Sequence, residues 1–99
     1  MKLQIQSVHF DADVKLLEFI QKKLDKLETF YDHIVDGEVF LRLEKGESNK
    51  DNKIVEVKLN VPGSKLFAKS QKESFEAATD DAVDSLRRQI TKFKEKLAS

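Results

Sequence analysis

The stretch from Val55 to Ser70, VEVKLNVPGSKLFAKS, decides the fold because it holds two strands and the turn that joins them. Apolar and polar residues alternate from Val55 to Val61, which is typical of a strand with one buried face. Pro62-Gly63 then predicts a tight turn, because proline presets φ and glycine accepts a positive φ. Ser64 to Ser70 is expected to return as a second, antiparallel strand, so the stretch forms a hairpin.

Further strands and a loop are predicted upstream of this hairpin. Alternation over Lys2 to Val8, and again over Val39 to Leu43, indicates two more half-buried strands. The segment from Glu44 to Lys53 is polar and contains Gly46, so we expect an exposed hairpin loop there. The chain therefore supplies four strands.

Two amphipathic helices complete the pattern. Between Val14 and Tyr31 apolar residues recur at helical spacing, and Asp11 or Asp13 can cap the helix. Ser74 can cap a last helix. The apolar stripe of the first helix is Leu17, Ile20, Leu24, Leu27 and Tyr31, and that of the last is Phe75, Ala82, Val83, Leu86, Ile90, Phe93 and Leu97.

The element order β-α-β-β-β-α predicts an α+β domain of two layers. Each helix has one apolar stripe, so both can pack on one face of a four-stranded mixed sheet. The first connection passes through a helix and should join parallel neighbours, whereas the later turns make antiparallel pairs. With 99 residues we expect a single domain, 1–99.

Composition excludes several classes of protein. There is no cysteine for a disulfide, a thiolate metal site or a cysteine nucleophile. No apolar run resembles a signal peptide or approaches the roughly 18 residues of a membrane span. We therefore expect a cytoplasmic protein that does not bind membranes.

Catalytic and metal-binding patterns are also missing from the sequence. His9 and His33 lie at opposite ends of the first predicted helix and outside any metal-ligand spacing, and the glycines form no phosphate loop. The carboxylates fall on predicted solvent faces, where nothing raises their pKa. We expect no catalytic residue, no metal, no cofactor and no enzyme activity.

Charge is sorted along the chain although 18 basic residues balance 18 acidic ones. Five acids and no base lie between Glu73 and Asp84, and five bases with one acid follow between Ser85 and Leu97. Acids near the N-terminus of a helix and bases near its C-terminus both interact favourably with the helix macrodipole. We hypothesise that Asp80, Asp81 and Asp84 cap and orient the helix.

A sharper interpretation of the basic end is a surface for an anionic partner. On the last helix Arg88, Lys92 and Lys96 form one stripe, with Arg87 and Lys94 on its shoulder. If the first helix packs alongside, Lys22, Lys23 and Lys26 extend the stripe into a two-helix patch. Several spaced cations suit a sugar-phosphate backbone through counterion release. The alternative is a solvated helix surface that carries lysines only for solubility.

Phe40 and Phe67 offer a different kind of surface. Alternation points both side chains away from the helices, onto the open face of the sheet with Arg42, Lys58 and Lys69. A stacking platform for single-stranded RNA is one interpretation, and mutual cross-strand packing of the two rings is the simpler one. The patch also allows an alternative function, a protein-interaction module around Phe40 and Phe67.

Three segments resemble the ribosome hibernation promoting factors, also called ribosome-associated inhibitors. They are KLDKLETFYDHI (Lys23 to Ile34), FLRLEK (Phe40 to Lys45) and AATDDAVDSLRRQITKFKEKL (Ala77 to Leu97). The most specific part is the spacing D-x-x-x-D-x-L-x-x-Q-x-x-K-x-K from Asp80 to Lys94. The resemblance covers essentially the whole chain.

This resemblance implies a double-stranded-RNA-binding-like fold and a definite function. The chain would bind ribosomal RNA in the mRNA and tRNA channel of the small ribosomal subunit and keep idle ribosomes inactive during stress or stationary phase. It looks like a short-type factor that is a monomer off the ribosome. If ribosomes dimerise in its host, we expect a separate dimerising factor.

The resemblance also implies which residues bind ribosomal RNA. The basic positions of the family fall on Lys23 and Lys26 in the first helix, and on the last helix at Arg88, Lys92 and Lys94, with Gln89 as a polar neighbour. Lys22, Arg87 and Lys96 extend the same surface. Three positions depart from the family pattern: Ser85 stands where lysine is common, Leu17 where arginine is frequent, and Glu76 where an aromatic is often found.

Overall fold

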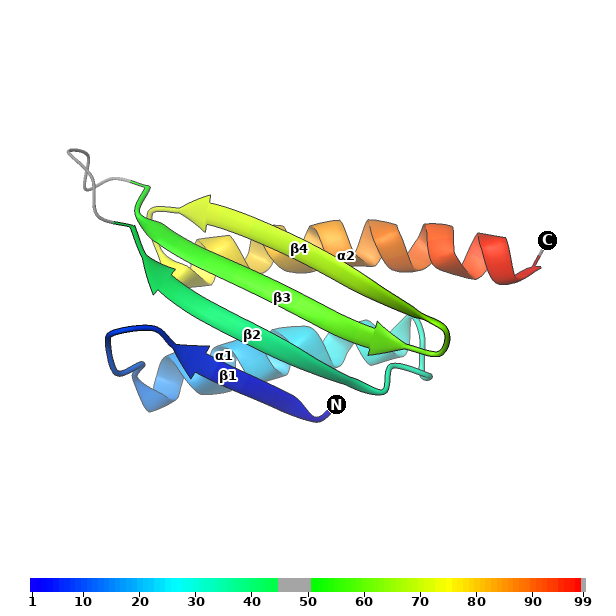
Figure 1. Cartoon of the computed structure of the whole chain (residues 1–99), viewed down its shortest axis with the longest axis horizontal. Helices are drawn as coiled ribbons and strands as arrows, with labels where there is room; N and C mark the ends of the chain where they lie inside the picture. The colour runs from blue at the N-terminus through cyan, green and yellow to red at the C-terminus, as the bar shows by residue number, and fades with distance from the viewer. Residues whose placement is uncertain (45–50, 99) are drawn as a thin grey trace.

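A computed structural model describes residues 1–44 and 51–98, and four strands form one sheet in the order β1-β2-β3-β4 (Figure 1). β1 (Leu3–Ser7) pairs in parallel with β2 (Asp36–Leu43). β3 (Lys53–Val61) is antiparallel to β2 and to β4 (Ser64–Lys72). The predicted mixed sheet is confirmed, with strand ends shifted by a few residues.

The turn between β3 and β4 forms where the sequence predicts it. Val61 pairs with Ser64 across the two-residue loop, and Gly63 adopts a positive φ of 78°. At the other end of β3, the backbone N–H of Glu44 donates to the carbonyl of Asn52 at 2.9 Å. Most of the loop predicted over Glu44 to Lys53 lies outside the described residues.

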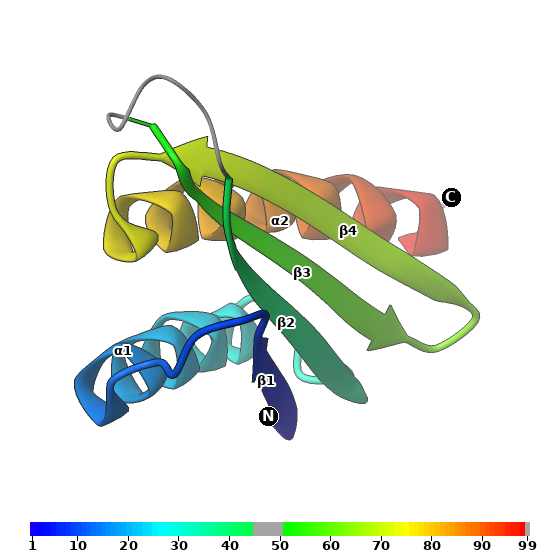
Figure 2. The same ribbon diagram turned by 60° about the vertical axis from the view of Figure 1, so that its left-hand side comes forward.

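Both helices cover one face of the sheet, as Figures 1 and 2 show from two sides. α1 spans Val14–Asp25 and α2 spans Phe75–Ala98. The side chain of Asp13 accepts a hydrogen bond from the N–H of Lys15 at 3.3 Å, and Oγ of Ser74 accepts from the N–H of Ala77 at 3.0 Å. These bonds confirm Asp13 and Ser74 as the capping residues.

The first helix is shorter than the sequence predicts. The α-helix ends at Asp25, and a 3₁₀ turn, η1 (Lys26–Thr29), replaces the last predicted turn. A 3₁₀ turn brings residues three apart onto one face, so Leu27 stays buried below Leu24 in the core. The prediction that one helix continues to Tyr31 is therefore wrong, because the chain tightens into the 3₁₀ turn after Asp25.

The core lies between the helices and the inner face of the sheet. Its largest fully buried side chains come from every element except β1 and β4, and include Ile20, Leu24, Leu27, Val39, Leu41, Val55, Val57, Leu59, Leu86 and Ile90. The sequence predicts Leu97 on the same stripe, but Leu97 is 62% exposed. α2 runs past the end of the sheet (Figure 1), so Leu97 has no strand to pack on.

Candidate nucleic-acid interface

Three basic side chains join α2 to the segment formed by α1, η1 and Phe30, which confirms the predicted contact between the two helices. Nζ of Lys23 on α1 lies 3.2 Å from Oδ1 of Asp80 on α2. On α2, the guanidinium of Arg87 lies 5.4 Å from the centre of the Phe30 ring. Nζ of Lys94 donates to the carbonyl oxygen of Phe30 at 2.8 Å. Cations from both helices therefore line one seam.

The seam is a groove with mixed charge. Lys23, Lys26 and Arg87 contribute positive charge, and Asp80 and Asp84 stand beside them on the α2 side. The groove holds about 470 Å³ and is also lined by Leu27, Thr29, Phe30 and Val83. Because acids neutralise part of this groove, its cations are less available to an anionic partner than unpaired cations would be.

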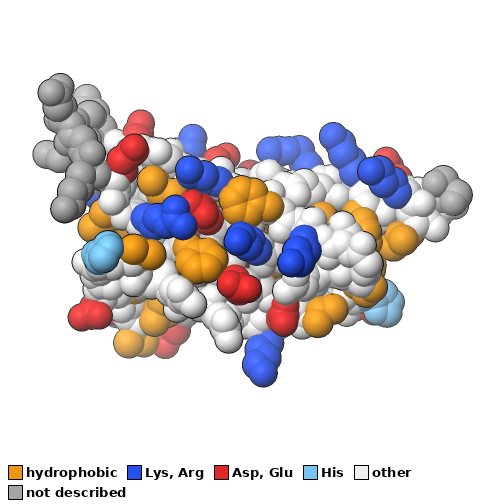
Figure 3. All heavy atoms as spheres, in the orientation of Figure 1, with side chains coloured by type: hydrophobic (Ala, Val, Ile, Leu, Met, Phe, Trp, Pro, Cys, Tyr) orange, Lys and Arg blue, Asp and Glu red, His pale blue; other side chains and the backbone are white. Residues whose placement is uncertain are grey.

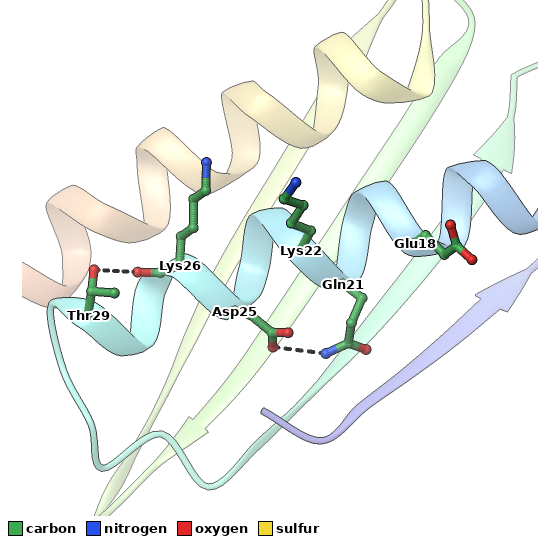
Figure 4. Close-up of a pocket in the computed structure, with 6 residues that line it drawn as sticks. All are labelled: Glu18, Gln21, Lys22, Asp25, Lys26 and Thr29. Carbon is green, nitrogen blue, oxygen red and sulfur yellow. Dashed lines mark hydrogen bonds between the residues drawn. The ribbon is translucent and has the colours of Figure 1, made fainter.

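Four of the predicted binding cations on the helices lie outside this network. In the described part of the chain, the side chains of Lys22, Lys26, Arg88 and Lys92 have no ion-pair or hydrogen-bond partner. All four are exposed, two on the α1–η1 segment and two on α2. Figure 4 shows Lys22 and Lys26 projecting to the same side, away from Gln21 and Asp25. These four are the cations best able to meet phosphates.

Gln89 is placed differently from the cations. Its Nε2 donates to the carbonyl oxygen of Phe67 at 2.8 Å, and its Oε1 accepts from the N–H of Phe67 at 3.3 Å. Nε2 also lies 3.1 Å from Oγ of Ser85. The amide thus binds the open edge of β4, and a role of Gln89 in RNA binding stays a prediction.

Two further positions from the sequence flank the surface. Lys96 lies one turn beyond Lys92 on the same exposed side of α2. Leu17, where the family often has arginine, is half-buried on α1. The part of either position in RNA contact stays a prediction.

Phe30 is a residue that sequence reasoning missed. It is absent from the apolar stripe predicted for the first helix, yet it contacts two cations of α2: its side chain is 43% exposed beneath the Arg87 guanidinium, and its carbonyl oxygen accepts from Lys94. The 3₁₀ turn ends at Thr29, so Phe30 leaves the apolar stripe and closes the seam. The only signal in the sequence is its position beside, rather than on, the predicted stripe.

The other flank of α1 is acidic and faces the N-terminus. The Met1 amino group donates to Oδ1 of Asp25 at 2.7 Å and also to Glu28. Hydrogen bonds to these two carboxylates raise the pKa of the Met1 amino group above its usual range. This flank marks one border of the basic surface.

The acids at the start of α2 orient the helix, but they do not cap it. Oδ2 of Asp81 accepts a hydrogen bond from Oγ of Ser70 at 2.6 Å, which joins α2 to β4. Asp80 joins α2 to α1 through Lys23. Ser74 caps the helix instead, because the three acids lie beyond the first turn where N–H groups are unpaired.

Metal-ligand clusters and membrane spans are both missing from the described residues. Among residues 1–44 and 51–98, no group of three or more His, Cys, Asp or Glu side chains could hold a metal ion. No helix in these ranges is long and apolar enough to cross a membrane.

Comparison with known proteins identifies relatives over nearly the whole chain. The family model described as sigma 54 modulation protein / S30EA ribosomal protein matches residues 3–98. A ribosome hibernation promoting factor of Escherichia coli (strain K12) is 34% identical over 97 residues, which cover 98% of this chain and 97% of that protein. A ribosomal subunit interface protein from Coxiella burnetii has a similar structure, with a TM-score of 0.85 and 25% identity over 96% of this chain and 99% of that one.

One relative is longer. The ribosome hibernation promotion factor of Deinococcus radiodurans is 34% identical over 91 residues, or 92% of this chain. The match covers 48% of that protein, so the chain spans about half its length.

Proposed function

Because the chain belongs to the sigma 54 modulation protein / S30EA ribosomal protein family, we propose that it is a ribosome hibernation factor. It binds ribosomal RNA in the mRNA and tRNA channel of the small subunit and blocks translation by occupying that channel. No bond is made or broken in this mechanism, so the protein acts without catalysis. The names of relatives from Escherichia coli and Deinococcus radiodurans support the hibernation role.

The observation that carries the proposal is the placement of free cations on both helices. Lys22 and Lys26 come from α1 and η1, and Arg88 and Lys92 come from α2. A phosphate backbone rewards several spaced cations, because each neutralised phosphate releases condensed counterions. A chain with no net charge lacks a general attraction to RNA, so its binding depends on where these cations lie.

Cosedimentation tests the function directly. Purified protein mixed with idle small subunits at low salt is expected to pellet with them, and added mRNA and tRNA should compete with it. Protein that stays in the supernatant under these conditions would contradict the proposal.

Charge reversal tests the residues. The double variant Arg88→Glu/Lys92→Glu should bind ribosomes much more weakly, and its salt slope should fall by about one for each phosphate that is no longer neutralised. The matched control is Lys53→Glu/Lys72→Glu, which makes the same charge change at two residues that pair across β3 and β4. Lys53 proves to be the first residue of β3 rather than a loop residue. Equal losses in both variants would indicate nonspecific attraction and overturn the assignment.

The organisation of the protein in the cell is part of the same proposal. Residues 1–99 form one ribosome-binding domain, which is a monomer off the ribosome and works in the cytoplasm. Pairing of ribosomes, where it occurs, requires a separate dimerising factor. Adding this chain alone to purified ribosomes should therefore leave the ribosomes unpaired in a sucrose gradient, and paired ribosomes would show that this part is wrong.

A further inference from the structure

The outer face of the sheet, opposite the helices, carries an aromatic ring among cations. We propose that this face is a second binding site, for single-stranded RNA, in which a base stacks on Phe67 and flanking phosphates meet the lysines around it. The choice of RNA rests on the proposed function, since a protein in an RNA-lined channel has RNA on more than one side.

Phe67 is presented to solvent on a fixed backbone. Leu66 and Ala68 point into the core, so the alternation of β4 turns Phe67 outward, where it is 47% exposed. Gln89 binds both the N–H and the carbonyl oxygen of Phe67 from the side of α2. The edge strand is held at Phe67, so the backbone that carries the ring is fixed before any base arrives.

Three lysines surround Phe67 on the same face. Lys58 is its direct partner across β3 and β4, and Lys65 and Lys69 lie two residues to either side on β4. All three are exposed, and in the described ranges none has an ion-pair partner. Lys65 and Lys69 are four residues apart, about 13 Å along the strand, so the two lysines flank the ring on either side.

Two acids of this face are occupied, whereas Glu38 of β2 lies opposite Lys58 in the register. Glu56 is 9% exposed, and its Oε1 accepts from Nη1 of Arg42 at 2.7 Å. Asp36 accepts a hydrogen bond from the side chain of Asn60. The half of the face over β3 and β4 is therefore positive. Figure 3, which views this face, shows blue side chains around large orange ones, with red side chains among them.

A protein partner fits this face less well. The ring of Phe40 is covered by cations, with Arg42 at 6.0 Å and Lys58 at 5.7 Å from its centre. No ring contact joins Phe40 to Phe67 in the described residues, so the expected mutual packing is wrong: β3 lies between them. Protein interfaces need a larger apolar centre with few charges, whereas one ring among spaced lysines matches single-strand binding.

Tryptophan fluorescence tests the stacking. The chain contains no tryptophan, so Phe67→Trp introduces a single reporter at the site. The variant is made in the Arg88→Glu/Lys92→Glu background, which disables the helix surface. Decauridylate is expected to quench the indole emission in a saturable, salt-sensitive way. Absence of quenching overturns the proposal.

Affinity provides the second test. In the same background Phe67→Ser should bind labelled decauridylate about 5- to 150-fold more weakly than the parent, the range for loss of one base–aromatic stack, and Phe67→Tyr should restore binding. Val14→Ser is the control, since Val14 is also an exposed apolar residue but lies at the start of α1. Circular dichroism verifies that each variant is folded. Unchanged binding in Phe67→Ser, or equal loss in Val14→Ser, overturns the site.

The outcome can be separated from that of the proposed function. Phe67→Ser in the otherwise unchanged chain keeps Lys22, Lys26, Arg88 and Lys92, so it should still pellet with small subunits. If decauridylate binding fails while cosedimentation holds, only the sheet-face site is wrong. If a photo-cross-linker at position 67 reaches a ribosomal protein and no RNA in the complex, the site belongs to a protein partner and the proposal is overturned.

Discussion

At the scale of single residues, side chains that look alike in the sequence serve different purposes. Gln89 matches a polar position of the binding surface, yet its amide binds the backbone of Phe67. Lys23 and Lys22 are adjacent, but Lys23 pairs with Asp80 while Lys22 has no partner in the described residues. Glu56 alternates onto the outer face of the sheet and is nevertheless nearly buried beneath Arg42.

The Gln89 amide should contribute to stability through the edge of β4. Gln89→Leu is expected to lower the free energy of unfolding by about 0.5–1.5 kcal/mol, because two exposed hydrogen bonds to Phe67 and one to Ser85 disappear and water can partly replace them. Urea denaturation measures the change. Lys92→Leu, a change on the outer face of the same helix, should have little effect, and an equal decrease there would refute the role given to Gln89.

The Arg42–Glu56 pair gives a prediction about burial. Arg42→Leu leaves the Glu56 carboxylate without its cation, so we expect stability to fall by about 1–3 kcal/mol. Arg42→Leu/Glu56→Leu removes both charges and should recover much of that stability. A double-mutant cycle in urea checks the coupling, and additive effects would mean that the two groups do not interact.

At the scale of elements, acids in the seam between α1 and α2 pair with cations that could otherwise bind RNA. Asp80 lies 3.2 Å from Lys23, where both side chains are partly exposed. A pair of this kind contributes at most about 1 kcal/mol to stability. The acid therefore has a larger effect on the charge available for binding than on the fold.

Asp80→Asn should consequently strengthen binding to small subunits. Freeing Lys23 adds a cation to the helix surface, so the salt slope should steepen by up to about one, while the free energy of unfolding changes by less than about 1 kcal/mol. Cosedimentation over a range of salt concentrations measures the slope. Asp51→Asn, which makes the same charge change just before β3, is the control, and an equal gain in it would point to net charge alone.

At the scale of the whole molecule, the helices and the sheet share one core. Leu86 and Ile90 of α2, Ile20 and Leu24 of α1, and the inner faces of β2 and β3 are fully buried together. Elements that share a core are expected to unfold together.

The chain should accordingly unfold in one transition. Far-UV circular dichroism and the emission of Tyr31, the single tyrosine, are expected to give the same midpoint. Leu86→Ala should lower the free energy of unfolding by about 2–5 kcal/mol, whichever signal is used to measure it, because Leu86 is fully buried. Leu97→Ala, on the same helix, should change stability by less than about 0.5 kcal/mol. Two separate transitions would contradict the single domain.

Periodicity and turn residues make most of the fold predictable. The Pro62-Gly63 turn, the Ser74 cap and the phase of every strand from β1 to β4 are local properties, and all are confirmed. The end of α1 and the exposure of Leu97 are not predictable in this way, because each depends on where a neighbouring element stops. The candidate cations are likewise visible in the sequence as positively charged residues at helical spacing.

The sequence by itself determined which elements form, which face of each is apolar, and which residues carry positive charge. Only the tertiary structure decided which of those charges are free. Whether Lys23 meets Asp80, Lys94 meets the carbonyl of Phe30, or Gln89 meets β4 depends on distances between segments far apart in the chain. Those distances arise from packing of the shared core, and electrostatic and hydrogen-bond energies change over a few ångströms, so no local pattern specifies them.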